Sequence, residues 1–593
     1  MRSVVGVIAP LNEPAGPMSS PEAAATEPGQ TSEVLRNSAL MATGTVASRI
    51  TGVIRDICIA AAIGSFMLAD TYALGNSLPN IIYILVVGGA LNAIFVPQLV
   101  RAMQRDDDGG AAYADRLLTL VGLVLIILSI AAVLLAPWIV RIYATAEYGP
   151  NELSLATAFA RYCLPQIFFY GIYTMFSQVL NARLHFGAPM FAPIVNNVVM
   201  IATAITFMWV AGTMVSTSTI TPGQTALLGI GTTVGVAAQA LVLIPVLARV
   251  GYKFRPRFDW RGHGLGKAGS LAGWTIGLVL VNQIGFLVIS RLATEANVIA
   301  SQIGGTPQGL ATYQRAFLVF MLPHSVITIS LVTALLPRMS KAAAEHRLNE
   351  VATDVSEGMR LIGALIIPCV AFLGIFGPMV GTLFFSVGAN RGAAATYTGL
   401  VVSAFAIALL PFSLFYMLLR GWYSVEDTRT PFLVTVLYNI IAIPLTIVLF
   451  MLAPDHYKVV SLALAYGIAY WITVVFAWIL LRRRLGSLDS RHTVASLAKM
   501  VVAALVSAAI GFGVAVGVVA AVMALLDKPV SGLYSPSWLT ALGCVVIGGI
   551  VTVVLYVAGA RLFRIRELAQ VTNLLGARIP GRLGRFVAGD PNE

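Results

Sequence analysis

The chain has 593 residues, of which 58% are hydrophobic and only 11% are charged. Soluble globular proteins carry about 25% charged residues, so this composition excludes a water-soluble or disordered chain and favours a polytopic membrane protein. Long apolar runs exclude an outer-membrane barrel, whose strands would alternate over about ten residues. The 38 basic residues exceed the 26 acidic ones, which in a membrane protein indicates basic cytosolic loops and not nucleic-acid binding.

Residues 1–37 are rich in Pro, Ser, Ala and Glu and predict a disordered cytosolic tail without a signal peptide. Fourteen apolar stretches then follow, each long enough to cross about 30 Å of hydrocarbon. Because the bilayer core offers no water to the backbone, each stretch is predicted to be a helix. They are 38–64, 70–101, 117–140, 153–181, 188–212, 225–249, 268–291, 309–337, 361–385, 395–420, 430–453, 460–481, 496–526 and 537–561.

The distribution of basic residues predicts the orientation of the chain across the membrane. If the N-terminus lies inside, inner loops and tails hold 29 basic residues and outer loops hold five, while four arginines lie within spans. This distribution places both termini in the cytosol and supports an even number of spans. The four cysteines lie in separate apolar runs without a C-x-x-C pair, so neither a disulfide nor a metal site is predicted.

Parts of the chain repeat at a spacing of about 240 residues, which is the distance between two sets of six spans. Leu164-Pro165 recurs as Leu410-Pro411, and the pair Pro189 and Asn197 recurs as Pro431 and Asn439. The repeat predicts an N-lobe at 38–250 and a C-lobe at 268–482, of six helices each.

The remaining segments connect or follow the two lobes. A cytosolic linker at 251–267 mixes basic and aromatic residues, which suits an interfacial segment as well as a solvated loop. Two further helices occupy 483–561, and residues 562–593 form a basic cytosolic tail. This tail is predicted to be amphipathic and to lie on the inner leaflet, with a disordered tail as the alternative. Gly231 and Gly235 form a GxxxG pair that indicates close helix packing.

Arginines within the spans are the main functional signal. A mid-span arginine costs about 2.5–3.5 kcal/mol on insertion scales, so it usually faces a watery cavity or a partner. Arg49 and Arg55 lie deep in the first span, whereas Arg315 is near enough to a span end to reach the interface, and Arg161 could be structural. Few acids oppose them, which predicts a cationic cavity suited to an anionic group such as pyrophosphate.

Residues 48–97 carry a specific pattern. It reads S-R-x-x-G-x-x-R-D from Ser48, followed by Gly64, Asp70, L-P-N at 78–80, G-A at 89–90 and F-V-P at 95–97. The pattern resembles the signature of the MurJ/MviN family of lipid II flippases. The resemblance implies an all-α exporter fold of about 14 helices in two six-helix lobes, plus two C-terminal helices, in the bacterial cytoplasmic membrane.

The same resemblance implies transport and no enzymatic step. The substrate would be the undecaprenyl-pyrophosphate-linked peptidoglycan precursor, moved from the inner to the outer leaflet by alternating access. The expected partners are membrane lipids and cell-wall synthesis proteins. Neither a cofactor nor a nucleic acid is expected. The substrate-binding residues predicted from the resemblance and the buried charges are Arg49, Arg55, Asp70, Asn80, Arg315 and Arg161.

Four positions depart from the family pattern. Tyr83 stands where members often have an arginine, and Gly88 stands at the acidic position that follows it. Leu318 stands at the usual arginine of span 8, one turn after Arg315. Ile443 replaces a carboxylate that some members use to bind sodium, which leaves ion coupling open. Two other functions stay open, namely export of a different polyprenyl-pyrophosphate glycan or a small molecule, and a non-transporting scaffold for wall synthesis.

Overall fold

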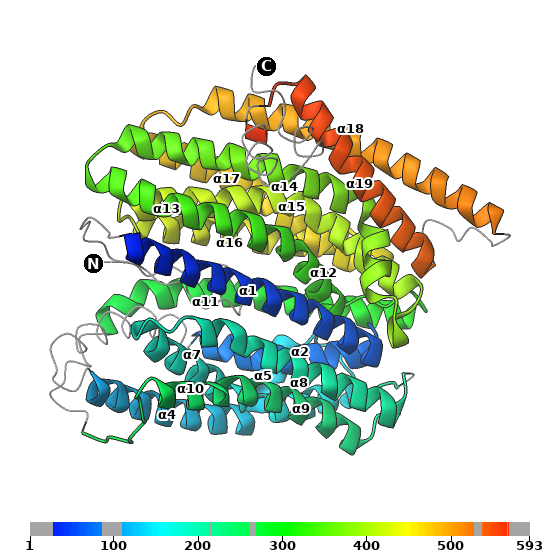
Figure 1. Ribbon diagram of the computed structural model, residues 1–593. Coiled ribbons are helices and arrows are strands. Elements are labelled where there is room, and N and C mark those ends of the chain that lie inside the picture. Colours follow the sequence, from blue (N-terminus) through cyan, green and yellow to red (C-terminus); the bar gives the residue numbers. More distant parts are fainter. Residues whose placement is uncertain are drawn as a thin grey trace. The chain divides into compact units, whose positions relative to one another are not determined.

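The computed structural model describes residues 28–85, 110–213, 215–259, 269–526, 537–565 and 567–568 (Figure 1). Every regular element in these ranges is a helix. The chain forms two compact units, one reaching Ala311 and including Val387–Asn390, the other holding Thr312–Ser386 and the chain from Arg391. The all-α class predicted from composition is therefore confirmed.

The first unit contains ten described α-helices and the short 3-10 helix Gly388–Asn390. The α-helices are α1 (Pro28–Ile63), α2 (Met67–Tyr83), α4 (Ala111–Leu134), α5 (Ala136–Tyr143), α6 (Pro150–Cys163), α7 (Gln166–Ala182), α8 (Gly187–Ala211), α9 (Pro222–Leu241), α10 (Leu243–Arg249) and α11 (Gly269–Gln302). The second unit holds most of α12 (Leu310–Pro323), followed by a π-helical turn at His324–Thr328. Its other helices are α13 (Ile329–Ala344), α14 (Leu348–Phe385), α15 (Ala393–Ser424), α16 (Arg429–Leu452), α17 (Lys458–Leu485), α18 (Ser490–Leu525) and α19 (Trp538–Leu562).

Eleven helical segments in the described ranges are long and apolar enough to cross a membrane, and they coincide with eleven of the fourteen predicted spans. The predicted spans 38–64, 70–101 and 153–181 are not among them. The first of these carries three charged side chains. Of the second, residues 70–83 lie in α2, and the described residues end at 85. The third is divided into α6 and α7 at Leu164-Pro165. The multi-pass architecture thus stands, but the count of fourteen is not established.

The division into units differs from the predicted lobes. The change of unit comes between Ala311 and Thr312, whereas the predicted linker lies at 251–267. Helix α11, predicted to open the C-lobe, belongs to the first unit. The arrangement of six plus six helices stays a prediction.

The GxxxG pair packs α9 closely against α8, as its sequence indicates. A Cβ atom at Gly231 would lie 2.4 Å from Cγ2 of Thr203, and one at Gly235 would lie 2.5 Å from Oδ1 of Asn196. Neither space can hold a methyl group without movement of α8. Small residues are therefore required where these two helices approach.

Aromatic rings fill the interior of the second unit. Tyr438 and Tyr470 have ring centroids 4.3 Å apart, and Phe412 contacts Tyr470 at 5.1 Å. His324 is fully buried beside them, with Nδ1 3.0 Å from Oγ of Ser413 and its ring 4.5 Å from that of Phe412. This environment is that of a packed core histidine.

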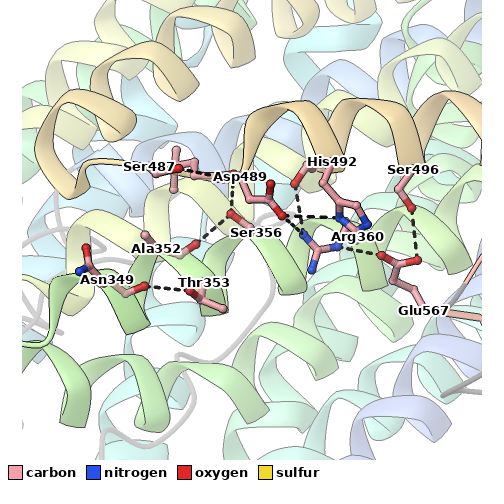
Figure 2. Close-up of polar contacts among 12 residues, drawn as sticks. Asn349, Ala352, Thr353, Ser356, Arg360, Ser487, Asp489, His492, Ser496 and Glu567 are labelled. Carbon is pink, nitrogen blue, oxygen red and sulfur yellow. Dashed lines mark hydrogen bonds and ion pairs between the residues drawn. The ribbon is translucent and has the colours of Figure 1, made fainter.

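Ionic contacts fasten the start of the C-terminal tail to the second unit (Figure 2). Arg360 Nε of α14 lies 2.8 Å from Oε1 of Glu567, and Oε2 of Glu567 accepts a hydrogen bond from Ser496 of α18 at 3.2 Å. A second, longer contact joins Arg360 to Asp489 at 3.7 Å. Glu567 is 6% exposed, so this carboxylate holds the tail to α14 and α18.

The described start of the tail corrects the predicted amphipathic face. Leu562 is 80% exposed, whereas Ile565 and Leu568 are buried against the protein. The three side chains therefore do not share one exposed apolar face. The rest of the predicted tail, from residue 569, lies outside the described residues.

Glu567→Ala is expected to release the start of the tail. The substitution removes two contacts of a buried carboxylate, worth about 2 kcal/mol together, so trypsin cleavage at Arg561 and Arg564 should accelerate by about tenfold or more. Limited proteolysis of the purified protein measures the rate. Asp489→Asn is the matched control, since Asp489 is 60% exposed and its contact is longer. Equal cleavage rates in the two variants would contradict this role for Glu567.

Candidate functional site

Arg55 is the centre of a polar cluster between α1 and α8. Its Nε and Nη2 atoms donate to Asp56 Oδ1 and Oδ2 at 3.0 and 3.2 Å, and Nη1 donates to Asn197 Oδ1 at 3.1 Å. The side-chain amide of Asn197 in turn donates to the carbonyl of Ser48 and the hydroxyl of Thr51, at 3.0 and 2.9 Å. Asn197 thereby crosslinks the two helices and orients the guanidinium.

Arg55 pairs with Asp56, its immediate neighbour on α1, although adjacent positions of a helix do not usually face each other. The rule holds for short side chains, but the long arginine stem turns back and forms a two-pronged contact with the adjacent carboxylate. Both side chains remain about one-fifth exposed. The cluster is therefore less cationic than the scarcity of acids predicted.

Arg49 lies on α1 six residues before Arg55, with a half-buried side chain. Asp70, in the first turn of α2, is fully buried. Its two carboxylate oxygens accept the backbone N–H groups of Leu310 and Ala311 at 3.1 and 2.9 Å, within the first unit. Asp70 thus stabilises the beginning of α12, and its predicted part in substrate binding stays a prediction.

One face of α2 is polar. Asn76, Asn80 and Tyr83 follow at intervals of four and three residues, which places them on the same side of a helix. Asn76 lies 3.5 Å from Gln166 of α7, and the hydroxyl of Tyr83 is 2.7 Å from that of Thr174. Asn80, predicted from the L-P-N motif, is half-buried between these contacts. The face offers neutral hydrogen-bonding groups in place of an arginine.

Tyr83→Arg is expected to be tolerated and to retain transport if this face meets an anionic substrate. Tyr83 is half-buried, and the centroid of its ring lies 5.9 Å from that of Tyr170. Because the position is not fully enclosed, an arginine side chain can be placed on the same face of α2. The measurement is growth and precursor export in a flippase-depleted cell. Tyr83→Glu is the charge-reversed control, which should lose activity because it repels the same anion. Equal activity in the Arg and Glu variants would contradict an anionic ligand at this face.

The other two predicted arginines occupy different environments. Arg161 is exposed in the last turn of α6, next to the break before α7. Arg315 lies in the second unit on α12 and is only 7% exposed. The sequence left open whether Arg315 reaches the membrane interface, and the structure buries it in the protein interior.

Asn197 is a site residue that the sequence reasoning missed. The sequence did contain a signal for it. An asparagine within an apolar span is costly to insert into the membrane, and this one recurs at the equivalent position as Asn439. Asn439 is buried and donates to the carbonyl of Thr435 at 3.0 Å within its own helix.

Within the described ranges, no group of three or more His, Cys, Asp or Glu side chains is placed to hold a metal ion.

Comparisons with known proteins find relatives that match most of the chain. The chain is 27% identical to a probable lipid II flippase MurJ of Rhizobium tropici, over 80% of this chain and 84% of that protein. It is 28% identical to a lipid II flippase MurJ of Burkholderia cenocepacia, over 68% and 77% of the two chains.

Solved structures share the fold. A lipid II flippase MurJ in an inward closed conformation superposes with a TM-score of 0.66 at 18% identity, covering 88% of this chain and 99% of that chain. An inward-facing multidrug resistance transporter of the MATE family and MOP superfamily gives 0.58 at 14% identity, covering 75% and 96%. Residues 59–526 match the family described as lipid II flippase MurJ, and the chain belongs to that family.

Proposed function

We propose that this chain is a lipid II flippase of the bacterial inner membrane, which moves the undecaprenyl-pyrophosphate-linked precursor of peptidoglycan to the outer leaflet. The observation that carries the proposal is the family match over residues 59–526. The Arg55 cluster adds a chemical reason, because a guanidinium held by Asn197 and Asp56 is suited to a pyrophosphate. The chain acts as a transporter and makes or breaks no covalent bond of the substrate.

Transport is proposed to proceed by alternating access. A charged head group cannot cross hydrocarbon unaided, since burying its charge is prohibitively costly. Arginines inside the membrane provide a polar path for that group. The partners are the lipid-linked substrate and membrane lipids, with cell-wall synthesis proteins as a further proposal. A scaffold without transport would gain nothing from the insertion cost of these arginines.

Depletion of the protein in its native cell tests the function. We expect lipid II to accumulate on the cytosolic side of the membrane, measured by its accessibility to an enzyme added from outside the cell. Accumulation of another polyprenyl-pyrophosphate glycan would favour the related exporter. Normal lipid II export with impaired wall assembly would favour the scaffold.

Both termini are proposed to lie in the cytosol, because the predicted inner loops carry most basic residues. A cysteine replacing Ile220 or Asp455 should react with an impermeant thiol reagent added outside. One replacing Phe258 or Ser487 should react only after the cells are opened. The four native cysteines, at 58, 163, 369 and 544, are first replaced to remove background labelling. Reversed labelling would overturn the orientation.

A further inference from the structure

The segment that follows α10 is fastened to the beginning of α4. The Tyr252 hydroxyl donates to Asp115 Oδ1 at 2.7 Å, and the Tyr252 side chain is 2% exposed. The backbone N–H of Arg255 donates to the same oxygen at 3.2 Å, and that of Arg257 donates to Thr119 at 3.0 Å. Asp115 and Thr119 lie one helical turn apart, so they hold the backbone of this segment at two successive points of α4.

Two acidic side chains in the described part of this region, Asp115 and Asp259, are bonded to internal partners. Asp115 is 4% exposed and holds the segment as described. Asp259 accepts hydrogen bonds from Nε and Nη2 of Arg116 at 3.0 and 2.7 Å, and these bonds hold the pKa of Asp259 below its usual value. Neither carboxylate therefore neutralises the outward basic side chains of the segment.

The exposed side chains of the segment include both cations and large rings. Phe254 is 45% exposed and Phe258 is 68% exposed, while Arg249, Lys253 and Arg255 are exposed as well. We call these five residues the linker strip. Exposure of two phenylalanine rings to water is unfavourable by roughly 25 cal/mol per Å² of apolar surface. At a bilayer surface the same rings enter the acyl boundary, and the cations meet lipid phosphates.

We propose that the linker strip binds the head groups of anionic glycerophospholipids in the leaflet that it faces. Charge complementarity selects this occupant, because three exposed cations occur within seven residues of the chain, while Asp115 and Asp259, which contact this segment and α4 in the described part of the chain, are bonded to other groups. The contact with α4 holds the backbone of the segment in place before lipid binds, so binding costs less conformational entropy. The contact concerns lipids that are not transported, so it extends beyond the flippase function.

Fluorescence quenching of the full-length protein in lipid nanodiscs tests the proposal. Phe258→Cys, in a background without the native cysteines, carries an environment-sensitive dye. The discs contain phosphatidylcholine alone or with added phosphatidylglycerol, and the quencher is a lipid brominated on its acyl chain. We expect stronger quenching in the phosphatidylglycerol discs, and we expect the difference to fall as salt is added.

Two triple variants separate the linker strip from the general basic charge of the protein. Arg249→Gln with Lys253→Gln and Arg255→Gln should reduce the phosphatidylglycerol-dependent quenching by about threefold or more. The matched control replaces Arg482, Arg483 and Arg484, the exposed arginines in the last turn of α17, and should leave it unchanged. Equal quenching in neutral and anionic discs, or equal losses in both triple variants, would overturn the proposal. Because the discs contain no transported substrate, failure here leaves the proposed flippase function untouched.

Discussion

Arg55→Ala and Arg49→Ala are each expected to reduce precursor export by tenfold or more, an effect of about 1.4 kcal/mol or larger. Arg55 directs its guanidinium to Asp56 and Asn197, both of which would lose that donor. Contacts between arginine and phosphate are strong where water is partly excluded. Because Tyr83 occupies a position where an arginine is usual in the family, the protein should depend heavily on these two.

Arg55→Lys separates charge from geometry. Lysine keeps the positive charge but has no planar fork, so it cannot contact Asp56 and Asn197 as the guanidinium does. We expect partial activity, above that of Arg55→Ala and below that of the native protein. Full activity in Arg55→Lys would mean that charge alone is required at this position.

Complementation of a flippase-depleted cell measures these variants, with the membrane level of each protein checked by immunoblotting. Arg141→Ala is the control, since Arg141 is exposed at the end of α5 and should be neutral. If Arg49→Ala and Arg55→Ala are both well expressed and both support normal growth and export, these arginines are structural and the proposed pyrophosphate contact is wrong.

Asp70→Ala is expected to destabilise the first unit severely. The fully buried carboxylate accepts two backbone hydrogen bonds from the beginning of α12. Each hydrogen bond to a charged group is worth about 1.5–3 kcal/mol, and the two N–H groups would be left without this acceptor. We expect a loss of about 3 kcal/mol or more, seen as a lower melting temperature in detergent and a lower level in the membrane.

Gly309→Ala tests the same contact from the other side. A Cβ atom at Gly309 would lie 1.9 Å from Oδ2 of Asp70, so even a methyl group must displace the carboxylate. We expect a melting temperature as low as that of Asp70→Ala, with the double variant no worse than either single one. Gly212→Ala is unsuitable as a control because its φ of +75° strains any side chain. Gly374→Ala has open space and should be neutral.

The two roles of Asp70 predict different results. If Asp70 binds substrate and contributes nothing to folding, Asp70→Ala will keep the native melting temperature and lose export. If it only stabilises α12, conditions that restore folding, such as lower growth temperature, will restore export in proportion to the amount of protein. A native melting temperature in Asp70→Ala would therefore contradict the structural role.

Composition and local pattern were sufficient to predict an all-helical membrane protein and its family. Each apolar stretch must become a helix in lipid whatever its neighbours are, because only then are its backbone groups satisfied. Eleven predicted spans accordingly coincide with apolar helices. The signature from Ser48 to Pro97 is likewise a local feature, and the family match over residues 59–526 includes its part from Gly64 onward.

The partners of the polar side chains were decided only by tertiary structure. Asp70 meets a backbone 240 residues away, and Arg55 meets an asparagine 142 residues away. The linker after α10 is held by Asp115, although its sequence suited a free loop equally well. Hydropathy predicts that a residue lies in a helix within the membrane, but it carries no information about which helices become neighbours. A buried polar group takes whichever partner packing brings within hydrogen-bond distance, and packing depends on the whole fold.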